Sequence, residues 1–548
     1  MRARPSSRRG LLLVIAGAVG LALAVAAGGS LGADTPQKAV APHFVDDTAV
    51  AGIDHRYDGA FEFFVGGGVA AFDCDDDGRP DLYFAGGSKP AALYRNESPA
   101  GGAFRFTREA SAATDLTAVT GAYPLDVDGD GHLDLAVLRV GEDVILRGRG
   151  DCEFERANEA FDIDGGNSWT VAFSAMWEGS NVLPTMAFGD YLAADRASCE
   201  DNRLVRPAER GDVYAPPVPL APGYCTLSIL FSDWHRSGQR DLRMTNDRHY
   251  YRDGTDQLWR MAADEAPSAY TEADGWRQLR IWGMGIASQD VTGDGVPEVF
   301  LTSQGDNKLQ TLAAGATGPT YDDIALQQGV TAHRPFAGGD VLPSTAWHAE
   351  FQDVNNDGFI DLFVSKGNVE AQLDYAGRDP SNLLLGQADG TFVESAEEAG
   401  ILSYHRARGA ALVDLNLDGM LDLVVVNRRE NITLWRNAGL GDADRPVAMG
   451  NWISLRVRQP APNVDAVGAW VEARLGDRTV VREVTVGGGH AGGQLGSIHV
   501  GLGAEDHAEV RVQWPDGETG PWMTVQAGER VTIDRGAAEP APSVPEEG

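Results

Sequence analysis

The sequence predicts an all-β protein: a β-propeller of seven blades, with six or eight as alternatives, followed by a small β-domain. Three observations lead to this prediction. An aspartate-rich loop of nine residues occurs five times along the chain. Each copy continues into a short run of aliphatic, β-branched or aromatic residues, which is typical of a strand. The copies recur at about 57 residues or a multiple of it, a length that suits four short strands.

The repeated loop has the ligand pattern of a calcium site. Oxygen-bearing side chains occupy positions 1, 3, 5 and 9, and glycine occupies position 6. Ca²⁺ takes about six to eight oxygen ligands, and the glycine lets the loop reverse direction. We therefore expect Ca²⁺ as the cofactor and these ligands: Asp73, Asp75, Asp77, Asp81, Asp126, Asp128, Asp130, Asp134, Asp290, Thr292, Asp294, Glu298, Asp353, Asn355, Asp357, Asp361, Asp414, Asn416, Asp418 and Asp422.

An EF-hand shares the first half of this pattern, but the second half excludes it. An EF-hand requires a bidentate glutamate at position 12 and a helix on each side of the loop. Position 12 is apolar in every copy: Phe84, Val137, Leu301, Val364 and Val425. The flanking segments are short and β-like, so the sequence predicts strand–loop–strand sites.

The interval between Asp126 and Asp290 leaves room for two further repeats. Residues 231–242 form a degenerate copy, in which His235 and Ser237 stand at ligand positions. We expect no calcium there, because too few oxygens remain. Residues 186–192 are the expected remnant of the other repeat, which has lost its calcium loop. The total is seven repeats.

The segment 44–53 indicates how the first and last repeats are joined. It resembles segments 321–330 and 392–401, which follow the second strand pair of their repeats, yet it precedes the first loop. A ring whose first and last repeats share a blade requires such a leading fragment.

The remaining boundaries follow from composition. Residues 1–33 have a basic start, an apolar stretch and small residues, as in a secretory signal peptide; an uncleaved anchor is the alternative. The predicted propeller covers 34–440 and the β-domain 441–536. The segment 537–548, rich in Pro, Ala and Glu, is predicted to be disordered.

Export would make the four cysteines disulfide formers, with about three possible connectivities. Cys199 and Cys225 flank a proline-rich segment and are the most natural pair. A closed loop of that length contributes roughly 3 kcal/mol in the chain-entropy model. Cys74 and Cys152 would then form the second disulfide.

The chain is strongly acidic, with a formal net charge of −35. This charge argues against nucleic acid and anionic membranes as partners. Seventeen of the acidic residues are predicted calcium ligands, so five Ca²⁺ ions would leave a net charge of about −25. No segment beyond the N-terminal one is apolar enough to span a membrane.

The loops and the strands that follow them resemble the FG-GAP/VCBS repeats of integrin α-chain propellers. The C-terminal part resembles the ASPIC/UnbV module that follows such propellers in the cartilage acidic protein-like family. In that part, the Gly-Gly-Gly-His-Ala-Gly-Gly run departs from the usual serine-rich form. The segments that carry the second resemblance are Asn451–Val457, Ala466–Glu472, Val486–His490, Leu495–Gly503 and Val510–Gly517.

Two functions remain open. The first is an exported calcium-binding propeller that acts as a binding or adhesion module for an extracellular protein or a carbohydrate. The alternative is an exported hydrolase or lyase with its active site on propeller loops, for which segment 165–225 is the candidate region. No serine-nucleophile elbow, zinc helix, phosphate loop or cofactor fingerprint is found, so the binding module is favoured and no catalytic residue is assigned. Either protein would be secreted, periplasmic or attached to the cell surface.

Several aromatic and histidine residues have two interpretations. Trp169, Trp177, Trp234, Trp282 and Trp347 are suited to a sugar-binding surface, but packing between blades is favoured. The spacing of His490, His499 and His507 fits no zinc pattern, so turn and surface positions are expected. His249 lies near Asp247 without a nucleophile and is interpreted as a polar residue at a strand end. We further expect calcium to be structural, so that chelation unfolds the propeller while the C-terminal domain persists.

Overall fold

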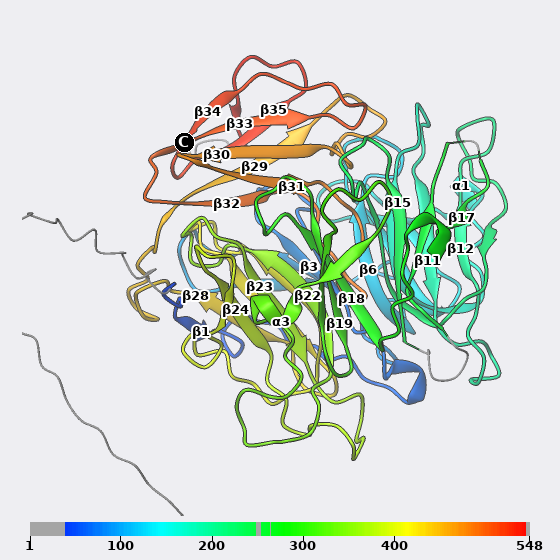
Figure 1. The fold of residues 1–548 in the computed structure, drawn as a ribbon, viewed down its shortest axis with the longest axis horizontal. Coiled ribbons are helices and arrows are strands. Elements are labelled where there is room, and N and C mark those ends of the chain that lie inside the picture. Colours follow the sequence, from blue (N-terminus) through cyan, green and yellow to red (C-terminus); the bar gives the residue numbers. More distant parts are fainter. Residues whose placement is uncertain (1–38, 248–253, 264, 544–548) are drawn as a thin grey trace, which may run out of the picture. The chain divides into compact units, whose positions relative to one another are not determined.

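A computed structural model describes residues 39–247, 254–263 and 265–543, which belong to one compact unit. The predicted signal peptide and His249 lie outside these residues. Strands dominate this unit (Figure 1). The short helical segments are η1 (Phe61–Phe63), α1 (Asn158–Phe161), η2 (Glu272–Asp274) and α3 (Ala325–Gln328). None of the described helices is long and apolar enough to cross a membrane.

Most of the described chain before residue 438 consists of antiparallel groups of four strands. Four of these groups are separate sheets: β2 (Val69–Phe72), β3 (Asp81–Phe84), β4 (Ala92–Asn96) and β5 (Phe106–Glu109); β14 (Thr226–Ser232), β15 (Asp241–Asn246), β16 (Gln257–Arg260) and β17 (Ser268–Ala269); β18 (Gly283–Gln289), β19 (Glu298–Ser303), β20 (Lys308–Leu312) and β21 (Tyr321–Asp323); and β22 (Ala346–Gln352), β23 (Asp361–Lys366), β24 (Asn382–Gly386) and β25 (Phe392–Glu394).

Two further groups merge into one eight-stranded sheet because β7 pairs with β10. The first group is β6 (Val119–Leu125), β7 (Asp134–Gly141), β8 (Val144–Gly148) and β9 (Phe154–Arg156). The second group is β10 (Ser168–Met176), β11 (Thr185–Asp190), β12 (Asn202–Val205) and β13 (Val218–Leu220).

The last group of this series takes one strand from the other end of the chain. It contains β26 (Ala407–Val413), β27 (Asp422–Asn427), β28 (Thr433–Asn437) and β1 (Phe44–Asp46). Phe44 pairs with Asn437 in antiparallel register. The prediction that the leading segment shares a sheet with the last repeat is confirmed.

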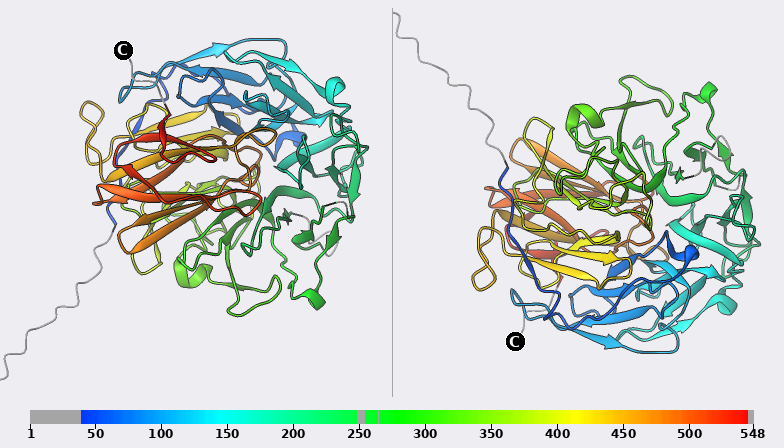
Figure 2. Two further views of the ribbon diagram at one scale, coloured as in Figure 1. Left: turned by 90° about the horizontal axis from the view of Figure 1, so that it is seen from above. Right: turned by 90° about the horizontal axis from the view of Figure 1, so that it is seen from below.

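The first strands of these groups lie side by side around a common axis, visible from above and below in Figure 2. Each contacts the next in chain order, and β26 contacts β2. Hydrophobic side chains fill the space between neighbouring groups: the rings of Phe300 in β19 and Phe351 in β22 are 6.2 Å apart. The described fold is therefore all-β and consistent with a propeller of FG-GAP-like repeats.

The strand register places every repeated loop between the first and second strands of its group. The residue before each predicted calcium loop pairs with loop position 9, as Phe72 does with Asp81. In the third group the corresponding pair is Met176 and Thr185. The equivalent of the calcium loop is therefore 177–185. Residues 186–192 do belong to this repeat, but they lie mostly in its second strand, β11, rather than at its loop.

The C-terminal strands form two four-stranded sheets, drawn in orange and red in Figure 1. One contains β29 (Asn451–Arg458), β32 (Ile498–Gly503), β35 (Arg530–Asp534) and β36 (Ala541–Pro542), and the other β30 (Trp470–Leu475), β31 (Arg478–Glu483), β33 (His507–Gln513) and β34 (Met523–Gln526). Because β36 pairs with β35, the prediction of a disordered tail is wrong for these residues.

A glycine-rich segment of the C-terminal part, 486–494, runs between the first strands of the propeller groups. It forms bridges with residues of five of them: Ala71, Ala122, Ala175, Leu230 and Ile286. We call this segment the plug. The propeller strands have glycines where the plug passes: a Cβ atom on Gly68 would lie 1.7 Å from the carbonyl oxygen of Ala491. The plug therefore fills the space around the axis.

Both predicted disulfides are present, Cys199–Cys225 and Cys74–Cys152. Each joins cysteines whose Cα atoms are 4.7 Å apart. Segment 165–225, proposed above as the region of an enzyme site, forms strands β10 to β13.

Candidate metal sites

The five predicted calcium loops share one hydrogen-bonded skeleton. In each, the carboxylate at position 1 accepts the backbone N–H of the glycine at position 6, with N–O distances of 2.7 to 3.0 Å. These glycines have φ between +82° and +92°, a conformation that favours glycine. The carboxylate at position 5 accepts the N–H of position 7, at 2.8 to 3.0 Å.

Position 9 is the most buried predicted ligand of each loop. Asp81, Asp134, Glu298, Asp361 and Asp422 are at most 1% exposed. One carboxylate oxygen accepts the N–H of position 2, at 2.8 to 2.9 Å. In the four aspartates the other oxygen accepts a backbone N–H from the third strand, at 2.7 to 2.9 Å. In Glu298 it accepts the hydroxyls of Thr292 and Thr311 instead.

In two of the five loops the structure brings three predicted ligands together closely enough to hold a metal ion. Carboxylate oxygens of Asp73, Asp75 and Asp81 lie within 4.8 Å of one another. Asp126, Asp128 and Asp134 form the same group in the next loop. In the loops with asparagine at position 3, the position-5 carboxylate accepts the Nδ2 group of that asparagine, at 2.9 Å in 353–361 and 3.1 Å in 414–422.

Two buried oxygens in the loops have no hydrogen-bond partner in the structure: Asp73 Oδ1 and Asn416 Oδ1. The Asn416 side chain is fully buried. Leaving a buried oxygen without a partner costs about 1–3 kcal/mol, so such atoms are expected to have a ligand. Carboxylate and amide oxygens are the donors that Ca²⁺ prefers. The residues present therefore fit calcium.

Electrostatics favour a cation at the same points. Burial raises the pKa of Asp81 to about 8 and that of Asp353 to about 8. For Asp361, burial first and then the carboxylates of Asp353 and Asp357 raise the pKa well above its usual range. Burial likewise raises the pKa of Asp126 to about 7. Buried carboxyl groups in such proximity are unfavourable when ionised, and a bound divalent cation would offset that cost.

Four arginines contact carboxylates of predicted ligands, and one of them is Arg79, whose Nη1 lies 3.0 Å from Asp77 Oδ2. Arg95 Nη1 lies 3.2 Å from Asp75 Oδ2, and Arg147 Nη2 lies 3.0 Å from Asp130 Oδ2. Arg530, on the C-terminal strand β35, donates to Asp414 Oδ2 at 2.7 Å. These cations partly compensate the loop charges without filling the oxygen-lined centre.

The degenerate loop 233–241 keeps the hydrogen bond from position 6 to position 1, but its position-9 carboxylate has different partners. Gly238 still donates to Asp233 Oδ2, at 2.7 Å. Asp241 Oδ2, however, accepts the indole N–H of Trp234 at 2.9 Å and the hydroxyl of Tyr270 at 2.7 Å. Neutral donors thus take the place of the backbone N–H at position 2.

In the third group, an arginine side chain pairs with an acidic residue of the loop 177–185. Glu178 forms two hydrogen bonds of 2.8 Å with Arg206 and also accepts the Thr185 hydroxyl. Guanidinium and carboxylate thus neutralise each other inside this loop.

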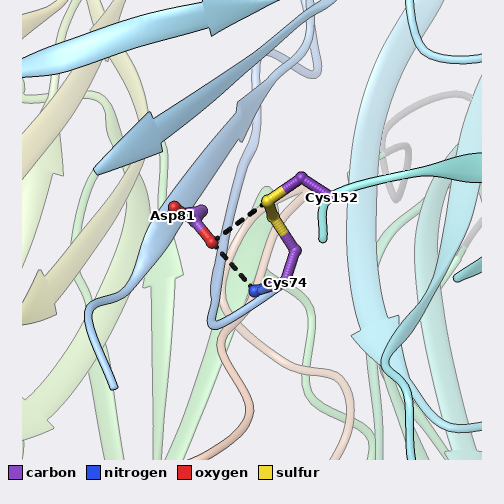
Figure 3. Close-up of side chains that lie close together, drawn as sticks. All are labelled: Cys74, Asp81 and Cys152. Atoms are coloured by element: carbon purple, nitrogen blue, oxygen red, sulfur yellow. Dashed lines mark hydrogen bonds between the residues drawn. A yellow bond between two sulfur atoms is a disulfide. The ribbon is translucent and has the colours of Figure 1, made fainter. Parts of the chain in front are cut away.

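A second group of metal-ligating residues near the first loop is not a metal site. Cys74, Asp81 and Cys152 lie close together, but the two cysteines form a disulfide (Figure 3). Asp81 Oδ2 accepts the N–H of Cys74 at 2.8 Å (Figure 3). The disulfide therefore attaches position 2 of the first loop to the following group.

The C-terminal sheets pack against the loop side of the propeller groups. Arg478 Nη1 donates to the carbonyl oxygen of Gly358 at 2.8 Å, and Asn356 Oδ1 lies 2.6 Å from His499 Nε2. A Cβ atom on Gly501 would lie 2.0 Å from Asp353 Oδ2. The two parts are thus in direct contact at the predicted calcium loops.

The sequence did not predict this contact or the plug. His490 is fully buried; its Nδ1 lies 2.9 Å from the carbonyl oxygen of Met284, and its Nε2 accepts the N–H of Gly66 at 3.2 Å. His499 is also buried, so the expected surface positions are wrong for both. His507 is exposed beside Asp506, as expected.

The tryptophans divide between the two interpretations. Trp169 and Trp347 are buried in one hydrophobic cluster, which confirms a packing role for them. Trp177, Trp234 and Trp282 are half-buried. The indole of Trp234 belongs to the degenerate loop, where it donates to Asp241.

Known families match both the strand groups before residue 438 and the C-terminal part of the chain. The FG-GAP-like repeat matches residues 73–137 and 353–425. The ASPIC and UnbV family matches residues 459–540. Cartilage acidic protein 1 of Mus musculus is 28% identical over 161 residues, which cover 26% of this chain and 21% of that protein. The match thus spans about a fifth of the relative's length.

Similarity to solved structures is weak. A lectin of Agrocybe aegerita, described as recognising non-reducing terminal N-acetylglucosamine, has a TM-score of 0.38 at 15% identity and covers 65% of this chain and 88% of its own. The N-terminal part of BBS1 in complex with ARL6 has a TM-score of 0.38 at 10% identity, with 74% and 99% covered. The Trypanosoma rangeli sialidase has a TM-score of 0.33 at 9% identity, with 60% and 55% covered. Values this low support no conclusion about ligands.

Proposed function

Because the chain carries FG-GAP-like repeats and an ASPIC and UnbV domain, we propose that it is an exported calcium-stabilised propeller that binds an extracellular protein or carbohydrate. The propeller has seven blades, spans 34–440 and is followed by a β-domain that begins at 441 and includes β36. Support for the blade number comes from the strand groups, with β1 completing the last of them.

The observation that carries the proposal is the repetition of one loop geometry. Five loops share the hydrogen bonds from position 6 to position 1, from position 7 to position 5 and from position 2 to position 9, and two buried oxygens in them lack a partner. When bound, Ca²⁺ supplies positive charge at the centre of each loop. The protein's own residues hold the ligands in place: the position-6 glycine fixes the first carboxylate, and strand N–H groups fix the ninth.

The calcium is structural. Position 9 lies at the start of the second strand and bonds to the third, so a filled loop ties three strands of one blade together. The carboxylates at positions 1, 5 and 9 accept backbone N–H groups of their own loop, which suits a site that holds an ion in place. Binding of a partner then uses surfaces away from the axis, because the plug occupies it.

Export is supported by the two disulfides, which persist in oxidising compartments. No specific observation favours the hydrolase or lyase alternative. The segment that would carry such a site contains β10 to β13 and the loops between them.

Native mass spectrometry of the protein, exchanged into calcium-containing volatile buffer, tests the metal proposal. We expect five ions, and four after Asp357→Ala. Ser237→Ala, at the same position of the degenerate loop, is the matched control and should retain five. A count of zero or seven in the wild type would refute the assignment.

The binding function needs a separate measurement. The calcium-loaded protein is screened on a glycan array and against immobilised extracellular-matrix proteins, with chromogenic glycoside and ester substrates tested in parallel. Saturable binding without turnover is expected. Turnover without stable binding would favour the enzyme instead.

A further inference from the structure

Asn437, the last residue of β28, connects two predicted calcium loops. Its backbone N–H donates to Asp422 Oδ1 at 2.9 Å, which is position 9 of the 414–422 loop. Its side-chain Nδ2 donates to the carbonyl oxygen of Val354 at 2.9 Å, which is position 2 of the 353–361 loop. The side chain is fully buried. One residue thus holds a ligand of its own loop and the backbone of the preceding loop.

Asn96, the last residue of β4, makes the same contacts one group further on. Its N–H donates to Asp81 Oδ1 at 2.8 Å. Its Nδ2 donates to the carbonyl oxygen of Leu415 at 2.8 Å, which is position 2 of the 414–422 loop. Although the chain separates Asn96 and Asn437 by most of the propeller, both end the third strand of their group.

The residue at position 2 completes the connection. Its carbonyl oxygen accepts the asparagine of the next group, while its N–H donates to position 9 of its own loop: Val354 to Asp361 at 2.8 Å and Leu415 to Asp422 at 2.9 Å. A continuous series of buried hydrogen bonds therefore runs from Asp361 through Asp422 to Asp81. Asn356 adds a direct bond, because its Nδ2 donates to the carbonyl oxygen of Gly419 at 2.9 Å.

This asparagine contact is missing at some of the boundaries between neighbouring strand groups of the described chain. In the second and sixth groups the equivalent strand position is Gly148 or Gly386, which donates an N–H to its own position 9 but has no side chain. A Cβ atom on Gly148 would lie 2.3 Å from the carbonyl oxygen of Leu133. Among the described residues, the 290–298 loop therefore has no asparagine linking it to the 353–361 loop.

We propose that Asn437 and Asn96 couple the 353–361, 414–422 and 73–81 loops, so that Ca²⁺ binds these three cooperatively while the 290–298 loop binds on its own. This inference rests on the proposed calcium binding and concerns its regulation. The coupling is transmitted by the protein's own hydrogen bonds. The asparagines bond to position-9 carboxylates and to the position-2 backbone of the loops that would hold the ions.

The physical basis is that linked loops share the conformational entropy that is lost when they become ordered. Fixing the position-9 carboxylate of one loop fixes the third strand of that group and, with it, the asparagine. The asparagine then fixes the position-2 peptide of the neighbouring loop, whose N–H orients the next position-9 carboxylate. An ion that binds second finds its loop already ordered and loses less conformational entropy, which is a positive coupling. Couplings of this kind change affinity by about fivefold or more.

The test compares the loss of one linked site with the loss of one unlinked site. Asp418→Ala removes the middle loop of the linked three, and Asp294→Ala removes the 290–298 loop. Native mass spectrometry at increasing free Ca²⁺ counts the ions on each molecule. For Asp418→Ala we expect the remaining linked loops to need about fivefold more Ca²⁺, and for Asp294→Ala the other four loops to fill as in the wild type.

The asparagines are tested directly. Asn437→Ala and Asn96→Ala should keep five ions at saturation, but intermediate species with one or two ions should become more abundant at half saturation. Asn427→Ala is the matched control, since the buried side chain of this residue, in the sheet of Asn437, donates to Asn431 and Thr433 of its own group and to no neighbouring loop among the described residues. Melting in saturating Ca²⁺ checks folding, and if either asparagine variant does not fold, the aspartate comparison decides.

The outcomes are distinct. A wild type with no ions would refute the proposed calcium binding itself. Five ions with a statistical distribution of intermediates, and equal effects of Asp418→Ala and Asp294→Ala, would refute the coupling alone.

Discussion

Removing calcium should lower the melting temperature of the whole described unit. At about 1 mM free Ca²⁺ and a Kd near 10⁻⁴ M, which is within the range of extracellular modules, each filled loop contributes about 1.4 kcal/mol. Five loops together contribute about 7 kcal/mol, comparable with the stability of a typical domain. Chelation withdraws this contribution and leaves the loop carboxylates facing one another.

The contacts between the propeller groups and the C-terminal sheets decide whether the loss of this free energy produces one unfolding transition or two. The plug and contacts such as Arg530–Asp414 join the C-terminal sheets to the propeller groups. We therefore expect one transition rather than a persisting C-terminal domain, in contrast to the expectation from sequence. With an unfolding entropy of about 2.1 cal/mol/K per residue over about 510 residues, a loss of about 7 kcal/mol lowers Tm by about 6.5 °C.

Differential scanning calorimetry with 1 mM Ca²⁺ or with excess chelator measures the shift. Limited proteolysis near the midpoint reports whether the C-terminal part survives. Magnesium at the same concentration is the control for general ionic effects. If the curves with Ca²⁺ and with chelator superimpose, the calcium assignment is wrong. A protease-resistant C-terminal fragment after chelation would instead refute the single transition.

Three further predictions concern other features. Gly68→Ala should destabilise the protein by about 1–3 kcal/mol in urea denaturation, because the added Cβ would meet the backbone of Ala491 in the plug. Replacing both Cys199 and Cys225 by Ser opens a loop with a sequence separation of 26, which should cost about 3.5 kcal/mol in the same assay. Burial lowers the pKa of His490 to about 3, so unfolding binds a proton below about pH 6.5. Stability is lost as pH falls, and His490→Gln should gain on the wild type by about 1.4 kcal/mol per pH unit between pH 6 and 4.

Each has a control and a contrary outcome. Gly377, with no atom within 4 Å of an added Cβ, should accept Ala with little change. A Gly68 variant as stable as that control would refute tight packing of the plug. Mild reductant should not act on the cysteine variant through Cys199–Cys225, because that bond is absent. Equal stability of the variant and the wild type would contradict the loop-closure estimate. A pH profile of the His490 variant parallel to the wild type would show that this histidine is not buried in its neutral form.

The local pattern was sufficient to predict the strands beside the repeated loops and the cysteine pairs, while calcium binding in those loops stays a prediction. The repeat also predicted that the segment beginning at Phe44 joins the last sheet, because a repeated sequence identifies its own displaced fragment. The strand predictions succeed because strand patterns are local properties. The loop of the third group was misplaced since 177–185 contains none of the repeated aspartates, and only strand register identifies it.

The plug and the asparagine contacts depend on residues far apart in the chain. In the sequence, Gly487 to Gly493 only depart from the usual serine-rich form, and their role becomes clear where they meet Gly68, just before β2, and Gly121 of β6. The signal that was available is the excess of glycine on both sides of the contact. Asn96 and Asn437 both follow an arginine at the end of a strand, a repeated dipeptide whose meaning depends on the neighbouring loop.

The pairing of β1 with β28 has a consequence for how the molecule is made. The first strand leaves the ribosome about 390 residues before its partner, which at 5–20 residues per second is a wait of roughly 20–80 s. During that time the exposed edge of β1 is open to mispairing, and the last sheet cannot be completed until β28 has emerged. The plug arrives later still. The ring must therefore stay open until nearly the whole polypeptide has been delivered, so the C-terminal part enters an axis that has only just been enclosed.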